Sequence, residues 1–101
     1  MDFYKEVPPS QIAAEKLHFI SAIFKLLPYK EDGYEFLDNY FESVLQQLIG
    51  FNKVSGSQPA TLSVINLLEY ARHEDDFKKY RKAVLDACGK VKLIKESDSD
   101  A

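Results

Sequence analysis

The sequence has few of the residues that build disulfide-linked, metal-centred or all-β proteins. It contains one cysteine, two histidines, no tryptophan, four glycines and four prolines in 101 residues. The single cysteine, Cys88, excludes a disulfide within the chain, so the fold does not depend on an oxidising compartment and we expect an intracellular protein. The shortage of turn-forming residues disfavours an all-β sandwich, which needs many short connections, and it favours helices.

Long apolar runs are also missing from the sequence. No window approaches the ~18 uninterrupted apolar residues of a transmembrane helix, and the first residues, MDFYKEVPPSQ, lack the basic and apolar stretches of a secretion signal. We therefore expect a soluble protein that does not enter a membrane. The composition is 46% hydrophobic, which is too apolar for a disordered chain, and 101 residues suffice for one domain with its own core.

The clearest helix signal lies between Asp32 and Gly50. Apolar residues return there at spacings of three and four, as on a helix buried along one side. They are Leu37, Phe41, Val44 and Leu48, with Tyr34, Tyr40, Leu45 and Ile49 beside them. Asp32 and Glu35 predict a capping box at the start, and Gly50 predicts a left-handed stop. The pattern predicts a helix over 34–49.

The segment before it predicts a helix over 10–27, capped by Ser10 and ended by Pro28. Its apolar residues form two stripes, one of Ala13, Leu17, Ile20, Phe24 and Leu27 and another of Ile12, Phe19, Ile23 and Leu26. The helix is therefore apolar around most of its circumference. Either it lies centrally in the fold, or one stripe faces a partner molecule.

The second half of the chain predicts two more helices. Pro59 fits the first turn of a helix over 59–72, after a polar loop at 51–58. The acids just before Phe77 predict the start of a helix over 76–88 or longer. Gly89 either ends that helix or lies inside it, and we favour continuation. A bent continuous helix over 59–88 is the alternative, because no glycine or proline separates the two patterns.

These elements predict an all-α fold, a compact antiparallel four-helix bundle. The single helical domain covers residues 10–95. An extended arm is expected at 1–9, since Pro8 and Pro9 prevent a helix from running through it. A disordered acidic tail is expected at 96–101, which has no large apolar side chain.

No group of residues in the sequence points to catalysis, a metal site or a cofactor. His18, His73 and Cys88 are far apart and in no metal-ligand spacing. Cys88 lies on an apolar stripe, which predicts a core residue and not a nucleophile. The clustered carboxylates fall where helix caps are needed, and no glycine-rich phosphate loop is present. We therefore expect no enzymatic activity and no cofactor.

Charge is unevenly distributed along the chain. The segment 31–49 carries acids and no base, whereas 77–95 is rich in lysine and has Asp86 as its one acid. The two segments either neutralise each other within the fold or are solvated. A basic patch of Lys78, Arg81, Lys82, Lys90 and Lys92 raises the alternative of a nucleic-acid-binding helical domain.

Protein recognition is the function that the composition favours most. Tyr29, Phe36, Tyr40 and Phe51 offer more aromatic surface than a small bundle readily hides, and we take them as candidate partner-binding residues. The expected role is an adaptor or regulatory module that binds a helix or peptide of another protein, or that forms a homodimer. A small immunity or inhibitor-type protein is a further alternative, because bacteriocin immunity proteins are similar small antiparallel four-helix bundles, a likeness of fold alone.

Overall fold

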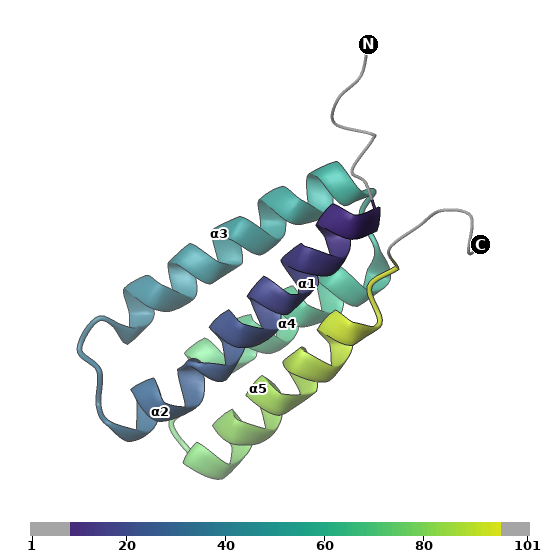
Figure 1. Cartoon of the computed structure of the whole chain (residues 1–101). Coiled ribbons are helices and arrows are strands. Elements are labelled where there is room, and N and C mark those ends of the chain that lie inside the picture. Colours follow the sequence, from purple (N-terminus) through teal and green to yellow (C-terminus); the bar gives the residue numbers. More distant parts are fainter. Residues whose placement is uncertain (1–8, 96–101) are drawn as a thin grey trace.

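The computed structural model describes residues 9–95, and within that range the chain forms helices and no strand. The elements are α1 (Pro9–Phe24), α2 (Leu26–Glu31), α3 (Leu37–Ser55), α4 (Pro59–Arg72) and α5 (Phe77–Lys92) (Figure 1). Because α2 follows α1 end to end, the two make one arm of an antiparallel four-helix bundle, and the predicted fold class is confirmed. The arm predicted at 1–9, apart from Pro9, and the tail predicted at 96–101 lie outside the described residues.

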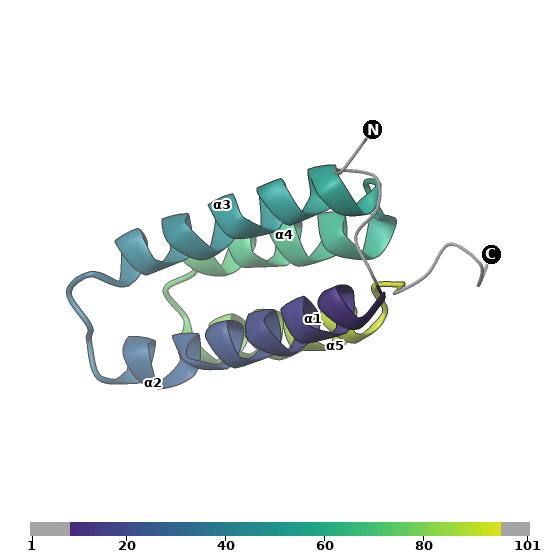
Figure 2. The ribbon, with the colours of Figure 1, turned by 45° about the horizontal axis from the view of Figure 1, so that its top comes forward.

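The helices form two layers. One layer holds α3 and α4, and the other holds α1, α2 and α5 (Figure 2). Helices α4 and α5 pack closely together, α5 also packs on α1, and α3 packs on α4. Consequently α3 and α5 lie diagonally across the bundle, with the core between them.

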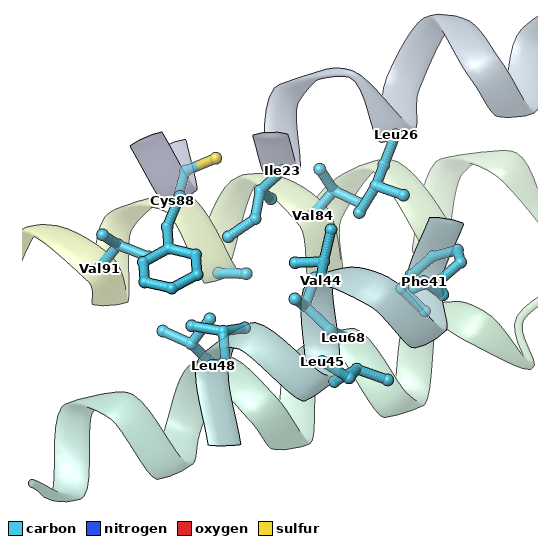
Figure 3. Close-up of a cluster of buried hydrophobic side chains, with 14 of the residues drawn as sticks. Ile23, Leu26, Phe41, Val44, Leu45, Leu48, Leu68, Val84, Cys88 and Val91 are labelled. Atoms are coloured by element: carbon cyan, nitrogen blue, oxygen red, sulfur yellow. The ribbon is translucent and has the colours of Figure 1, made fainter. Parts of the chain in front are cut away.

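All four arms contribute to one apolar core, and several of its side chains point into the same space in Figure 3. Its largest fully buried aliphatic and phenylalanine side chains are Phe19, Ile23, Leu26, Phe41, Leu48, Leu68, Val64, Val84, Val91 and Ile94. Cys88 is buried among them, as predicted. Thr61 is the one polar residue that is fully buried in the described chain, and it lies beside Val64 and Leu68 on α4.

Only one stripe of α1 enters the core. Ile12, Phe19 and Ile23 are buried, whereas Leu17 is 70% exposed and Phe24 is 47% exposed. Helix α1 is therefore not enclosed on all sides by the other helices, which was the first of the two alternatives. The stripe of Leu17 and Phe24 is divided, because its members Ile20 and Leu27 pack at the edge of the core while Leu17 and Phe24 face outward.

Tyr80 connects the two arms of one layer. Its ring is fully buried, and its hydroxyl donates a hydrogen bond to the carbonyl of Leu26 at 2.8 Å. Burial raises the pKa of the Tyr80 hydroxyl well above its usual value. Because Leu26 begins α2, this bond fixes the start of α2 against α5.

The start predicted for the helix near 10–27 agrees with α1 to within one residue, but the predicted end is wrong. The helix breaks at Lys25 before α2 begins. Pro28 does not end the helix but lies in the first turn of α2, where a missing N–H is tolerated. Residues 28–31, which lie between the two predicted helices, are thus helical.

The bounds predicted for the second helix, 34–49, are also wrong. It starts at Leu37, with Phe36 at the N-cap position and no capping side chain; Asp32 instead follows the end of α2. Gly50 lies inside α3, because Phe51 extends the buried stripe and packing carries the helix onward. The helix stops at Gly56, whose φ of +96° is left-handed. The predicted loop at 51–58 shortens to three residues.

The bounds of the two C-terminal helices agree better with those predicted from the sequence. The bounds predicted for α4 are confirmed. Asp76 caps α5 by accepting a hydrogen bond from the Lys79 N–H at 3.1 Å, and the helix continues through Gly89 to Lys92, as favoured. The chain turns between α4 and α5, so the continuous helix over 59–88 does not form.

Arg72 joins α4 to α3 through two carboxylates. Its guanidinium binds both oxygens of Asp38, at 2.7 and 2.9 Å, and Oε1 of Glu42 at 2.9 Å. The Arg72 hydrogen bond lowers the pKa of Asp38, and hydrogen bonds from Gln46 and then Arg72 lower the pKa of Glu42. The acids of α3 are therefore bound by a base of α4 and not by the bases of α5.

We predict opposite effects for alanine at Gly50, which lies inside α3, and at Gly56, where α3 stops. Apart from its chain neighbours and the backbone of its own helix, an added Cβ at Gly50 meets no atom within 4 Å, so Gly50→Ala should raise the free energy of unfolding by about 0.5–1 kcal/mol. Gly56→Ala should lower it by about 1 kcal/mol, because φ is +96° there. Urea denaturation measures both, and effects of the same sign would contradict the assigned end of α3.

Acid should weaken the contact of Arg72 with α3. The pKa values of Asp38 and Glu42 are lower in the folded state than their ordinary values of 3.8 and 4.5, so the contact stabilises the fold above those values and is lost as the pH falls below them. Arg72→Met should therefore flatten the decline of stability on acidification. Arg81→Met, at an exposed position of α5, is the control and should leave that decline unchanged. Equal slopes for Arg72→Met and the unmodified protein would contradict this assignment.

Candidate functional site

Four aromatic rings meet at the end of the bundle where α2 connects to α3. Tyr29 lies on α2, Tyr34 and Phe36 lie in the connection, and Tyr40 lies in the first turn of α3. The ring centroids are 4.7 Å apart for Tyr29 and Tyr34, 5.1 Å for Tyr29 and Tyr40, and 5.9 Å for Tyr34 and Phe36. We call these four residues the ring cluster. Three of them are residues that the sequence predicted for partner binding.

A local backbone motif brings the first two rings together. Gly33 has a φ of +70°, which lets the chain reverse directly after α2. The N–H of Tyr34 then donates to the carbonyl of Tyr29 at 2.9 Å, and the N–H of Gly33 donates to the carbonyl of Lys30 at 3.2 Å. This is the Schellman pattern, which commonly carries an apolar contact between the residues in the positions of Tyr29 and Tyr34.

A hydrogen bond to another arm fixes the third ring. The Tyr40 hydroxyl donates to the carbonyl of Ala22 on α1 at 2.7 Å. Burial, and to a lesser extent the neighbouring Tyr29, raises the pKa of Tyr40. The Tyr40 ring is thus held between α1 and α3, and Tyr29 stands edge-on to it.

The ring cluster has an anchored half and an exposed half. Tyr29 and Tyr40 are half-buried, whereas Phe36 is 54% exposed and Tyr34 is 42% exposed. The exposed acids Glu31, Asp32 and Glu35 each lie within two residues of a ring of the cluster along the chain. This arrangement offers a preformed apolar surface, and we call the three neighbouring acids its acidic rim.

The remaining candidate ring, Phe51, lies elsewhere. It is 7% exposed and packs edge-on against Phe19 of α1, with 5.5 Å between ring centroids. Phe51 therefore belongs mainly to the core, and the small exposed part of its ring lines an open pocket with Gln47 and Val54. Tyr34 takes its place in the cluster, although the sequence pattern assigned it to the buried stripe of a helix over 34–49. The Asp-Gly pair before Tyr34 is the signal that could have placed it in a turn.

The predicted basic patch is exposed along α5. Lys78, Arg81, Lys82, Lys90 and Lys92 all lie on its surface. Lys82 pairs with Asp86 at 3.0 Å, and Leu85, Gly89 and Leu93 separate the cations on the outward side. The patch is therefore not a continuous cationic row of the kind that follows a phosphate backbone.

The residues considered for catalysis or metal binding lie on different helices or at their ends. Burial raises the pKa of the Cys88 thiol to about 11, with nearby Lys92 acting in the opposite direction, so the thiol is protonated at neutral pH. His18 bonds Gln47 at 2.9 Å, and His73 lies at the end of α4. Among residues 9–95, no three His, Cys, Asp or Glu side chains are placed to hold a metal ion.

Comparisons of the chain with protein-family models, curated proteins and solved structures find no significant match. Over residues 9–95, no helix has both the length and the apolar character needed to span a membrane. The functional interpretation therefore rests on the geometry of the surface itself.

Removing the Tyr40 hydroxyl should loosen the ring cluster. Tyr40→Phe leaves the Ala22 carbonyl without this donor and should lower the free energy of unfolding by about 0.5–1.5 kcal/mol in urea denaturation. Tyr34→Phe removes a hydroxyl from an exposed ring and is the matched control, with an expected change below about 0.5 kcal/mol. If the two variants were equally stable, the Tyr40 bond would not anchor the cluster.

Proposed function

We propose that this protein is a non-catalytic interaction module, of adaptor or regulatory type, that binds another protein through the ring cluster. The observation that carries the proposal is the division of the cluster into two anchored rings, Tyr29 and Tyr40, and two exposed rings, Tyr34 and Phe36. Aromatic side chains at the centre of a patch supply much of the binding energy of protein interfaces.

Preorganisation supports this assignment. The Schellman turn and the hydrogen bond from Tyr40 to Ala22 hold the rings in place before any partner arrives. A partner that docks on them therefore loses less conformational entropy than it would on free side chains.

The acidic rim defines the chemistry of the partner. Glu31, Asp32 and Glu35 are exposed and lie next to the ring residues along the chain, whereas Asp38 is already bound to Arg72. A helix or peptide with apolar side chains flanked by lysine or arginine would match both the rings and the carboxylates.

A pull-down from extracts of the source cells, read by mass spectrometry, tests the proposal. Phe36→Ala should reduce recovery of the partner at least tenfold, because it removes the most exposed ring of the cluster. Leu62→Ala is the matched control, since Leu62 is 47% exposed on α4 near the opposite end of the bundle. Circular dichroism should show both variants folded.

Two results would reject this function. One is equal recovery of the same partner by Phe36→Ala and Leu62→Ala, which would place the binding surface elsewhere. The other is loss of helical structure in Phe36→Ala, which would make Phe36 a residue of the fold and not of the surface.

A further inference from the structure

The exposed half of the ring cluster consists of two neighbouring rings. Phe36 is 54% exposed and Tyr34 is 42% exposed, and their ring centroids lie 5.9 Å apart with an angle of 72° between the planes. We call these two residues the exposed pair. A cation binds an aromatic ring within about 6 Å of its centroid, so one cationic group can contact both rings.

The chain around the exposed pair carries negative charge. Glu35 joins Tyr34 to Phe36, so its Cα atom lies about 3.8 Å from the Cα atom of each. Glu31 and Asp32 precede Tyr34 by three and two residues. All three acids are exposed, and none of them forms an ion pair within residues 9–95. A cation at the exposed pair is therefore favoured by unpaired carboxylates as well as by the rings.

The one base in this part of the chain is directed to another ring. Lys30 is the only lysine or arginine between positions 29 and 40. Its Nζ atom lies over the ring of Tyr80 on α5, 5.2 Å from the centroid. This is the cation–π contact found within residues 9–95, and it does not involve the exposed pair. A cation for the exposed pair is thus expected from a partner.

An apolar side chain alone would be a poor occupant of this surface. It would cover the rings, but it would also shield Glu35 from water. A carboxylate that loses hydration without gaining a partner raises the free energy of the complex. A cationic side chain avoids that loss, because it contacts the rings and also pairs with the carboxylate.

Among cationic groups, the guanidinium of arginine fits an open pair of rings best. It is planar and weakly hydrated, stacks on aromatic faces, and keeps five N–H donors for carboxylates. The lysine ammonium is instead a strongly hydrated point charge. A trimethylated lysine has no N–H donor and is recognised by aromatic cages. Two rings that are each about half exposed do not enclose a ligand in that way.

Given that the ring cluster is a docking surface, as proposed above, we propose that its exposed pair captures an arginine side chain of the partner. The guanidinium stacks on Phe36 and Tyr34 and donates hydrogen bonds to the carboxylate of Glu35. The anchored rings, Tyr29 and Tyr40, support Tyr34 from the side of the bundle. The partner is thus a protein segment that presents an arginine among apolar residues.

A matched pair of peptides tests the capture of arginine. One is a blocked Leu-Arg-Leu tripeptide, and the other carries citrulline in place of arginine, which keeps a planar end group but has no charge. In NMR titrations of the full chain at low salt, the arginine peptide should shift the ring signals of Tyr34 and Phe36 in a saturable way. The citrulline peptide should bind at least about fivefold more weakly, because it lacks the cation–π contact and the ion pair.

Variants at the surface separate the ring contact from the charge contact. Phe36→Leu keeps an apolar side chain but removes an aromatic face, so it should reduce the preference for arginine over citrulline at least about twofold. Phe24→Leu is the matched control, since Phe24 is 47% exposed on α1, and it should keep the full preference. Glu35→Gln should weaken binding of the arginine peptide alone. Glu69→Gln, at an exposed position of α4, should change neither affinity.

Three results would overturn the capture of arginine. The first is equal affinity of the unmodified chain for the two peptides. The second is the absence of any shift of the Tyr34 and Phe36 signals at peptide concentrations up to about 10 mM. The third is tighter binding of a Leu-trimethyllysine-Leu peptide, which would assign the exposed pair to a quaternary ammonium group. None of these comparisons depends on a variant that has to fold.

Failure of this proposal can be distinguished from failure of the docking function. If the two peptides bind equally but Phe36→Ala loses the partner in the pull-down, the ring cluster is a docking surface that does not select arginine. If Phe36→Ala and Leu62→Ala recover the partner equally, the docking function itself is rejected.

Discussion

Each arm of a four-helix bundle can turn only one side toward the shared core, and this chain has more apolar residues than those sides accommodate. In α1 the limit selects the stripe that contains Phe19 and Ile23 and leaves Leu17 and Phe24 in water. The same limit operates at the end of α5, where Val91 and Ile94 are buried and Leu93 between them is exposed. Surplus apolar surface is thus a consequence of helical geometry, and its positions follow from which stripe each helix buries.

The sequence predicted the number of arms and the class of fold because periodicity reports which residues can share a face. It predicted α4 to the residue, since Pro59 marks a start that packing does not override. It failed at Pro28 and Gly50, where local stop signals compete with burial of later residues. Phe51 directly follows Gly50 and lies on the buried side of α3, and its burial outweighs the modest cost of a glycine inside the helix.

The sequence singled out three rings of the cluster, Tyr29, Phe36 and Tyr40, but it included Phe51 and missed Tyr34. It did not predict how the rings are arranged. Their convergence depends on a left-handed Gly33 and on a hydrogen bond between Tyr40 and Ala22, which are 18 positions apart in sequence. No periodic pattern encodes a contact of that kind, because it exists only after α1 and α3 have packed.

The diagonal placement of α3 and α5 determines which charged residues can form ion pairs. Arg72 on α4 holds Asp38 and Glu42, so the acids of α3 are partly neutralised without the lysines of α5. Those lysines remain on the outside of the bundle, and Lys82 is paired with Asp86 of its own helix. Because α3 and α5 do not pack on each other within residues 9–95, attraction between the acidic segment 31–49 and the basic segment 77–95 does not orient the helices. The shared apolar core and the contact of Arg72 with α3 do so instead.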